Sequence, residues 1–163
     1  MNAPLPRNFG FDIQDLMNAL SQGSTADGLR LRLTREQWDS LASYVQPLAL
    51  AAGQILIAQG GRDRTLYFIE SGSLSVHFQD EERKIHLALV GPGSAVGEGA
   101  FFTHQPRQAT VQAGVASKVW ALSPLRFMEL SKRQPETALE LAMRLGALVS
   151  TRLAHQRRRI AVT

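Results

Sequence analysis

The middle of the chain, over residues 48–123, reads as a series of short apolar segments separated by turn residues. The turns are expected at Gly60-Gly61, Ser71-Gly72-Ser73, Asp80-Glu81-Glu82 and Gly91-Pro92-Gly93. Strands rich in β-branched, aromatic and leucine residues are expected over 54–58, 65–71, 74–79, 84–90, 108–113 and 117–123. So many short strands at this spacing predict an antiparallel jelly-roll β-barrel.

Helical signals precede the strand-rich region. A short amphipathic helix is expected over residues 11–20, after ten residues that are rich in proline and asparagine and are expected to be disordered. Thr34 followed three residues later by Gln37 indicates a capping box at the start of a second helix. Pro47 is expected to end that helix, because the residue before a proline disfavours the helical conformation.

The helical pattern returns after the last expected strand. A short helix over 125–133 precedes a long one over 136–158, with Pro135 near its first turn, where proline is tolerated. The long helix carries a heptad seam of small and apolar residues: Leu139, Ala142, Gly146, Val149 and Leu153. A second stripe on an adjacent face comprises Leu141, Leu145 and Leu148. If one stripe packs on the barrel, the seam is left for a parallel homodimer. The competing outcome is a monomer in which both stripes fold back onto the body.

Length and composition describe one domain with an appendage. We expect residues 1–28 to be a flexible leader with a short helix and a linker, and residues 29–163 to be the domain. The fold class is therefore mainly β with flanking α-helices. The chain has no cysteine, which excludes disulfides and thiol catalysis. It has neither a secretory signal nor an apolar run near the roughly 20 residues of a membrane span, so a cytoplasmic protein without a membrane partner is expected.

The most specific chemistry lies within residues 96–111, where Glu98 is followed nine positions later by Arg107. Arginine supplies a forked, permanently charged donor for phosphate. The first amides of a short helix add unpaired N–H groups and the positive end of a dipole. A carboxylate repels phosphate but accepts hydrogen bonds from a sugar hydroxyl. Phosphate together with ribose indicates a nucleotide. The alternatives are that Arg107 forms a surface ion pair and that Glu98 complements the helix dipole.

The chain resembles, over residues 29–158, the cyclic nucleotide-binding domain of catabolite activator proteins and protein kinase A regulatory subunits. The resemblance is carried by Gly53, Gly60, Leu66-Tyr67-Phe68-Ile69 with Ser71-Gly72, Gly93, Gly97-Glu98, Pro106-Arg107-Gln108-Ala109-Thr110-Val111, Phe127 and Pro135. In that family the segment from the Gly-Glu pair to the arginine is the phosphate-binding cassette. The resemblance implies that Arg107 pairs with the cyclic phosphate and that Glu98 accepts from the ribose 2′-hydroxyl.

The resemblance also implies a wider set of ligand-binding residues: Gly97, Glu98, Gly99, Ala100, Arg107, Gln108, Ala109 and Arg152. The amides of Gly99 and Ala100 would complete the phosphate cradle, and Arg152 would lie near the base. The sequence departs from the family at Gly99, usually a bulky aliphatic residue, and at Gln108, usually Ala, Ser or Thr. Position 108 bears on base recognition, so the choice among cAMP, cGMP and a cyclic dinucleotide stays open.

The expected function is that of a stand-alone regulatory or sensor domain that binds cAMP or cGMP and signals through the cassette and the C-terminal helix. No cofactor, metal site or catalytic residue is indicated, because the histidines are scattered and no nucleophile motif is present. A second hypothesis is a ligand-free β-barrel interaction module. A third is a truncated relative of a catabolite activator-type regulator. Sequence-specific DNA binding is not expected, because no helix-turn-helix follows residue 158. The partner is a second copy of the chain or an unidentified protein.

Overall fold

Two four-stranded antiparallel sheets and five helices make up the structure, a computed structural model that describes residues 10–23, 26–83 and 85–161, without the side chains of residues 86 and 157–161. The strand order is β1-β8-β3-β6 in the first sheet and β2-β7-β4-β5 in the second. The strands are β1 (Gln46–Leu50), β2 (Ile55–Ile57), β3 (Leu66–Ser71), β4 (Leu74–Gln79), β5 (Ile85–Val90), β6 (Ala95–Val96), β7 (Thr110–Ala113) and β8 (Ser117–Leu122). The predicted class, a jelly-roll β-fold with flanking helices, is confirmed.

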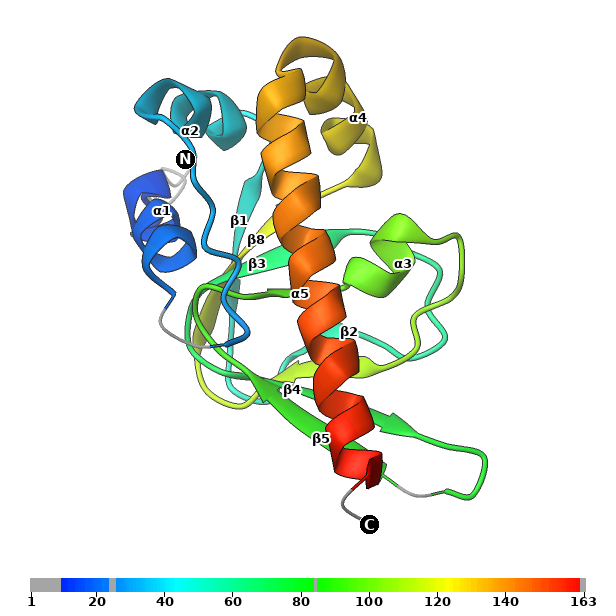
Figure 1. The fold of residues 1–163 in the computed structure, drawn as a ribbon. Helices are drawn as coiled ribbons and strands as arrows, with labels where there is room; N and C mark the ends of the chain where they lie inside the picture. Colours follow the sequence, from blue (N-terminus) through cyan, green and yellow to red (C-terminus); the bar gives the residue numbers. More distant parts are fainter. Residues whose placement is uncertain (1–9, 24–25, 84, 162–163) are drawn as a thin grey trace, which may run out of the picture.

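The helices flank these sheets as expected. They are α1 (Ile13–Gln22), α2 (Arg35–Ala42), α3 (Glu98–Phe102), α4 (Pro124–Arg133) and α5 (Pro135–Ala161). The long helix α5 runs across one face of the molecule, with α1 and α2 to one side of it and α3 and α4 to the other (Figure 1). The capping box is confirmed, because Thr34 Oγ1 accepts from the Gln37 amide and Gln37 Oε1 accepts from the Thr34 amide.

Two apolar cores hold these layers together. One lies between the two sheets and includes Ile69, Leu74 and Val119. The other joins the helices to the first sheet, and it contains Leu16 and Leu20 of α1, Phe68, Trp120, and the stripe Leu141, Leu145 and Leu148 of α5. The stripe therefore attaches the first half of α5 to the body.

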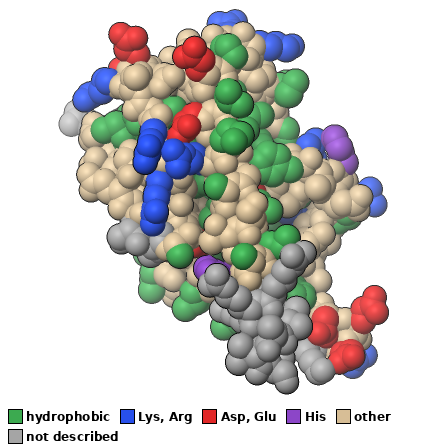
Figure 2. All heavy atoms as spheres, in the orientation of Figure 1, with side chains coloured by type: hydrophobic (Ala, Val, Ile, Leu, Met, Phe, Trp, Pro, Cys, Tyr) green, Lys and Arg blue, Asp and Glu red, His purple; other side chains and the backbone are tan. Residues whose placement is uncertain are grey.

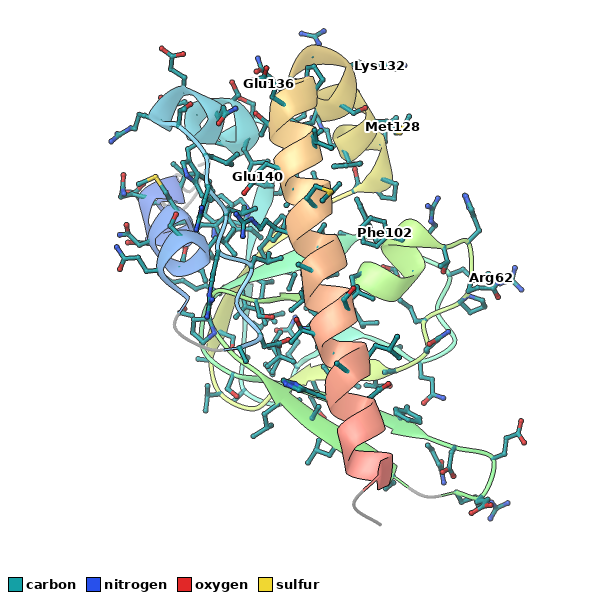
Figure 3. The ribbon with its side chains drawn as sticks, viewed as in Figure 1. Arg62, Phe102, Met128, Lys132, Glu136 and Glu140 are labelled. Carbon is teal, nitrogen blue, oxygen red and sulfur yellow. The ribbon has the colours of Figure 1, made fainter. Side chains whose placement is uncertain are left out.

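The opposite face of α5 carries exposed apolar side chains. In the predicted seam, Leu139, Val149 and Leu153 are 62%, 39% and 50% exposed. Figure 2 shows hydrophobic side chains gathered along α5 and over α4. Met128 of α4 and Phe102 of α3, both exposed, lie on the same side of α5 (Figure 3).

Strand β1 differs from the expectation for this region. Helix α2 ends at Ala42, so Pro47 does not end it and instead lies within β1, opposite Trp120 of β8. The strand is at the edge of its sheet, where a residue without an N–H group is tolerated. The expectation of helix up to Pro47 was therefore wrong. The expected disorder at the N-terminus concerns residues 1–9, which lie outside the described residues.

Candidate functional site

A tight turn joins β6 to α3 and begins the candidate site. Gly97 has φ +87°, a left-handed conformation that favours glycine. A Cβ at this position would lie 2.7 Å from Arg107 Nη1 and 2.8 Å from the Thr65 carbonyl oxygen, so only glycine fits. The turn places Glu98 and the next amides in the first turn of α3, where backbone N–H groups have no partner within the helix.

Arg107 is buried behind this turn, with 4% of its surface exposed. Its Nη1 donates to the Gly97 carbonyl at 3.0 Å and its Nη2 to the Thr65 carbonyl at 2.7 Å. Its own backbone is clamped by the preceding loop, since the Arg107 amide donates to Gly61 O and its carbonyl accepts from the Gly60 amide. The arginine therefore ties the cassette to the connection between β2 and β3.

Asp63 is the charge partner of this arginine and was not found from the sequence. Its Oδ2 lies 2.5 Å from Arg107 Nη2, and its Oδ1 accepts from Nε at 3.3 Å. The hydrogen bond from Arg107 holds the pKa of Asp63 below its ordinary value, against the opposing effect of burial. Asp63 accepts from both Nε and Nη2, which form one edge of the guanidinium. A phosphate can accept two hydrogen bonds from an arginine in the same way.

Glu98 is likewise engaged, by an arginine from the far end of α5. Arg152 Nη1 lies 2.6 Å from Glu98 Oε1. Asp27 accepts from Nε and Nη2 of the same guanidinium, at 2.9 Å each. Ser94 Oγ, which donates to Asp27, and the Ala95 carbonyl also accept from Nη2. Three segments distant in sequence thus meet at Arg152.

A second residue that the sequence analysis missed, Arg64, fixes the other end of α3. Arg64 donates from Nε to the Ala100 carbonyl and from Nη2 to the Phe101 carbonyl, both at 3.0 Å. Carbonyls at a helix C-terminus lack partners within the helix, and a cation is favourable there. Arg64 and Arg107 therefore hold the two ends of the cassette helix. Arg64 directly follows Asp63 in the chain, and the sequence analysis missed both because single charged residues in a loop give no periodic signal.

Comparison with known proteins decides the family. Residues 47–134, more than half of the chain, match the family model of the cyclic nucleotide-binding domain. This chain belongs to the cyclic nucleotide-binding domain family. The family match covers the barrel, the cassette and α4, and it ends just before α5.

Relatives of this cyclic nucleotide-binding domain include regulators. The cAMP-activated global transcriptional regulator CRP of Escherichia coli O6:H1 is 38% identical over 100 residues, which are 60% of this chain and 46% of that protein. The chain thus spans about half the length of this relative. A cyclic nucleotide-binding domain from Methylobacillus flagellatus KT is similar in fold, with a TM-score of 0.80, 22% identity, and coverage of 91% of this chain and 82% of that one. The regulatory domain of Toxoplasma gondii PKA with cAMP has a TM-score of 0.60 and 27% identity, over 72% of this chain and 43% of that one.

The remaining predicted residues of the cyclic nucleotide-binding domain lie around the same cassette. Gly99 and Gln108 are exposed, Ala100 is buried, and Ala109 is half-buried. A Cβ at Gly99 would meet nothing within 4 Å, so this departure from the family leaves open space beside α3. Hydrogen bonds join Arg107 to Gly97 and Arg152 to Glu98, so these four predicted residues lie together. The side chain of Gln108 is exposed.

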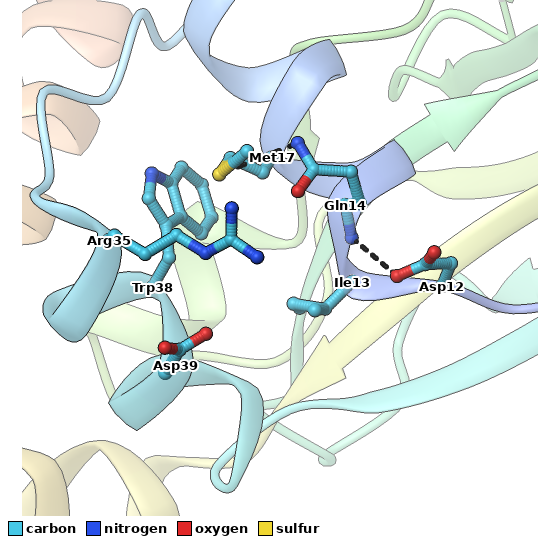
Figure 4. Close-up of a pocket in the computed structure, with 7 residues that line it drawn as sticks. All are labelled: Asp12, Ile13, Gln14, Met17, Arg35, Trp38 and Asp39. Carbon is cyan, nitrogen blue, oxygen red and sulfur yellow. Dashed lines mark hydrogen bonds between the residues drawn. The ribbon is translucent and has the colours of Figure 1, made fainter.

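No group of three or more His, Asp or Glu side chains that could hold a metal ion occurs among the described residues. None of the helices in that part combines the length and hydropathy that crossing a membrane requires. A cleft of about 170 Å³ lies between α1 and α2, where Met17 faces Arg35 and Trp38 (Figure 4). Its lining includes none of the cassette residues.

Proposed function

We propose that this domain binds a cyclic nucleotide monophosphate, cAMP or cGMP, in the cassette between Gly97 and Ala109, and that it acts as a regulatory domain. The observation that carries the proposal is the juxtaposition of the Arg107 guanidinium with the Gly97 turn that presents Glu98. Phosphate would bind at Arg107 and at the amides of Gly99 and Ala100, and the ribose 2′-hydroxyl would donate to Glu98.

Arg107 retains capacity for a phosphate oxygen. A guanidinium has five N–H donors, and the described residues take four: two by Asp63 and one each by Gly97 and Thr65. The remaining N–H is on Nη1, the nitrogen that contacts Gly97 O at the start of the cassette. One N–H donor would thus be available for a phosphate oxygen while the four other contacts remain.

Names of relatives favour cAMP over cGMP. The Escherichia coli relative is described as cAMP-activated, and the Toxoplasma gondii structure contains cAMP. Gln108 follows Arg107 at the position that bears on base recognition by the resemblance, and its exposed amide could hydrogen-bond a purine edge.

Signalling would pass through α5. The helix contacts the cassette through Arg152 and Glu98, and its opposite face carries the exposed seam from Leu139 to Leu153. A parallel homodimer along that seam would bring a change at the cassette to an interface. An unidentified protein bound to the same face is the alternative partner.

Calorimetric titration with cAMP and cGMP tests the proposal. Arg107→Ala should weaken binding about 10- to 150-fold, the value of a hydrogen bond to a charged group, and Glu98→Ala should weaken it less. Arg126→Ala is the matched control, because Arg126 forms an exposed ion pair with Glu129 on α4. Equal affinities in all four proteins would remove Arg107 and Glu98 from the site.

The second candidate function is a ligand-free interaction module. It is favoured by one observation: both proposed binding residues already have partners, Arg107 in Asp63 and Glu98 in Arg152. If a folded protein gives no heat of binding with cAMP or cGMP in this titration, the interaction module is favoured over the sensor.

A further inference from the structure

Glu98 faces two competing donors if a nucleotide binds as proposed. One is the ribose hydroxyl, and the other is the Arg152 guanidinium that contacts it in the structure at 2.6 Å. The side chains of Arg152 and Glu98 are only 23% and 20% exposed, so water screens their attraction only in part. A hydroxyl that donates to Glu98 must therefore displace the arginine or share the carboxylate with it.

Arg152 is fixed by groups other than Glu98. Asp27 accepts hydrogen bonds from its Nε and Nη2. Ser94 Oγ and the Ala95 carbonyl oxygen lie 3.0 Å and 2.8 Å from Nη2. Burial lowers the pKa of Arg152, but hydrogen bonding to Asp27 and attraction to both carboxylates outweigh it, so the pKa is raised. The guanidinium is a positioned cation, unlike a surface arginine that samples many rotamers.

The distal part of α5 depends on this arginine for attachment. The buried residues of the helix end at Leu148. Among the side chains described after it, through residue 156, only Thr151 and Arg152 are partly covered, and the others are exposed. The contacts of Arg152 therefore make up most of what holds this stretch of helix to the barrel.

We propose that Arg152 is an autoinhibitory latch, which competes with the nucleotide sugar for Glu98 and couples occupancy of the site to the attachment of distal α5. This inference rests on the proposed function. Because both partners use one carboxylate, ligand and latch weaken each other by the same factor. The linker that carries Asp27 belongs to the same cluster, because Asp27 accepts from Nε and Nη2 of the guanidinium whose Nη1 contacts Glu98.

As a latch, Arg152 lowers the affinity for the nucleotide, whereas the base contact expected from the sequence would raise it. A base contact helps the ligand, and its removal weakens binding. A competitor opposes the ligand, and its removal strengthens binding. A purely structural role cannot produce the second result, because damage to the fold lowers affinity.

Calorimetric titration with cAMP separates these roles. Arg152→Ala and Arg152→Gln should each bind about 10-fold more tightly than the unaltered chain, the lower end of the range for a charge-assisted hydrogen bond. Arg144→Ala is the matched control on the same helix, since Arg144 pairs with Glu140 at 2.8 Å and has a 29% exposed side chain. Its affinity should not change. Weaker or unchanged binding by Arg152→Ala would overturn the latch, whereas no binding by any protein would overturn the proposed function itself.

Hydrogen exchange provides a readout that needs no ligand. Without nucleotide, the amides of residues 149–156 should exchange several-fold faster in Arg152→Ala than in the unaltered chain or Arg144→Ala, because the anchor of this stretch is gone. Amides over residues 138–148 should keep their rates, because the buried stripe holds that half of the helix. Unchanged rates over 149–156 in Arg152→Ala would reject the latch independently of any binding result.

Discussion

Arg107 and Asp63 form an ion pair in which a buried cation meets a solvent-facing carboxylate. The side chain of Arg107 is 2% exposed and that of Asp63 is 55% exposed, with Nη2 and Oδ2 2.5 Å apart. A buried charge without a partner destabilises the folded state, so the carboxylate of Asp63 offsets the free-energy cost of burying Arg107. Under the proposed function, the nucleotide phosphate would meet an arginine whose charge is already partly neutralised by Asp63.

Replacement of this arginine should cost stability as well as affinity. In Arg107→Ala the half-buried carbonyls of Gly97 and Thr65 lose their donor, and we expect the free energy of unfolding to fall by about 1–3 kcal/mol. Urea unfolding measures the change. Arg126→Ala, which breaks only an exposed pair, should stay within about 0.5 kcal/mol of the unaltered chain. Equal losses in the two variants would contradict a structural role for Arg107.

The Asp63–Arg107 pair should make stability depend on acid pH. The pKa of Asp63 in the folded protein is below its ordinary value of 3.8, so the pair stabilises the fold above that pH. The contribution should be lost as pH falls through the lower, folded-state pKa. Urea midpoints between about pH 6 and about pH 3 should therefore fall more steeply for the unaltered chain than for Asp63→Asn, which has no carboxylate to protonate. Parallel pH profiles would show that the pair adds no stability.

The turn at Gly97 should not tolerate a side chain. Gly97→Ala and Gly60→Ala share the strain of a positive φ, about 1–2 kcal/mol for a non-glycine residue. A Cβ at Gly60 meets nothing within 4 Å, whereas one at Gly97 meets Arg107 Nη1 and the Thr65 carbonyl. Gly97→Ala should therefore lose more stability in thermal unfolding, and only this variant should lose nucleotide affinity. Equal effects of the two substitutions would mean that the contact with Arg107 is easily relaxed.

The exposed seam of α5 should support a homodimer. Light scattering at micromolar concentration should give a dimer mass, because Leu139, Val149 and Leu153 would otherwise stay in water. Val149→Glu combined with Leu153→Glu should give a monomer, because it places charges in the interface.

A second pair of exposed aliphatic residues provides the control for that experiment. Ile85 and Leu89 of β5 are 74% and 72% exposed, and their replacement by glutamate adds the same charge on a strand outside the seam. This control should remain dimeric. A monomer mass for the unaltered chain, or a dimer unaffected by the substitutions at Val149 and Leu153, would exclude the seam.

Local patterns predicted much of this architecture, while distant partners were missed. Thr34 and Gln37 lie one turn apart, and Glu98 and Arg107 lie on one short segment, so their spacing carries the information. Asp63 is 44 residues from Arg107, and Asp27 is 125 residues from Arg152. Each is a single acid in a loop, without periodicity. The adjacent sequence does not indicate the folding that brings each acid to its arginine. The sequence analysis therefore named Glu98, Arg107 and Arg152, but neither Asp63 nor Asp27, the acids that pair with the two arginines.

Pro47 has a consequence for how the molecule behaves at high concentration. As a residue of edge strand β1, it presents no N–H group to a neighbouring chain, so the outer edge of that sheet is a poor template for adding a strand. The other sheet ends at β5, where no proline interrupts the strand and Ile85, Leu87 and Leu89 project into water. Aggregation through strand addition is therefore expected to begin at β5. A proline or lysine substituted into this strand should reduce that aggregation.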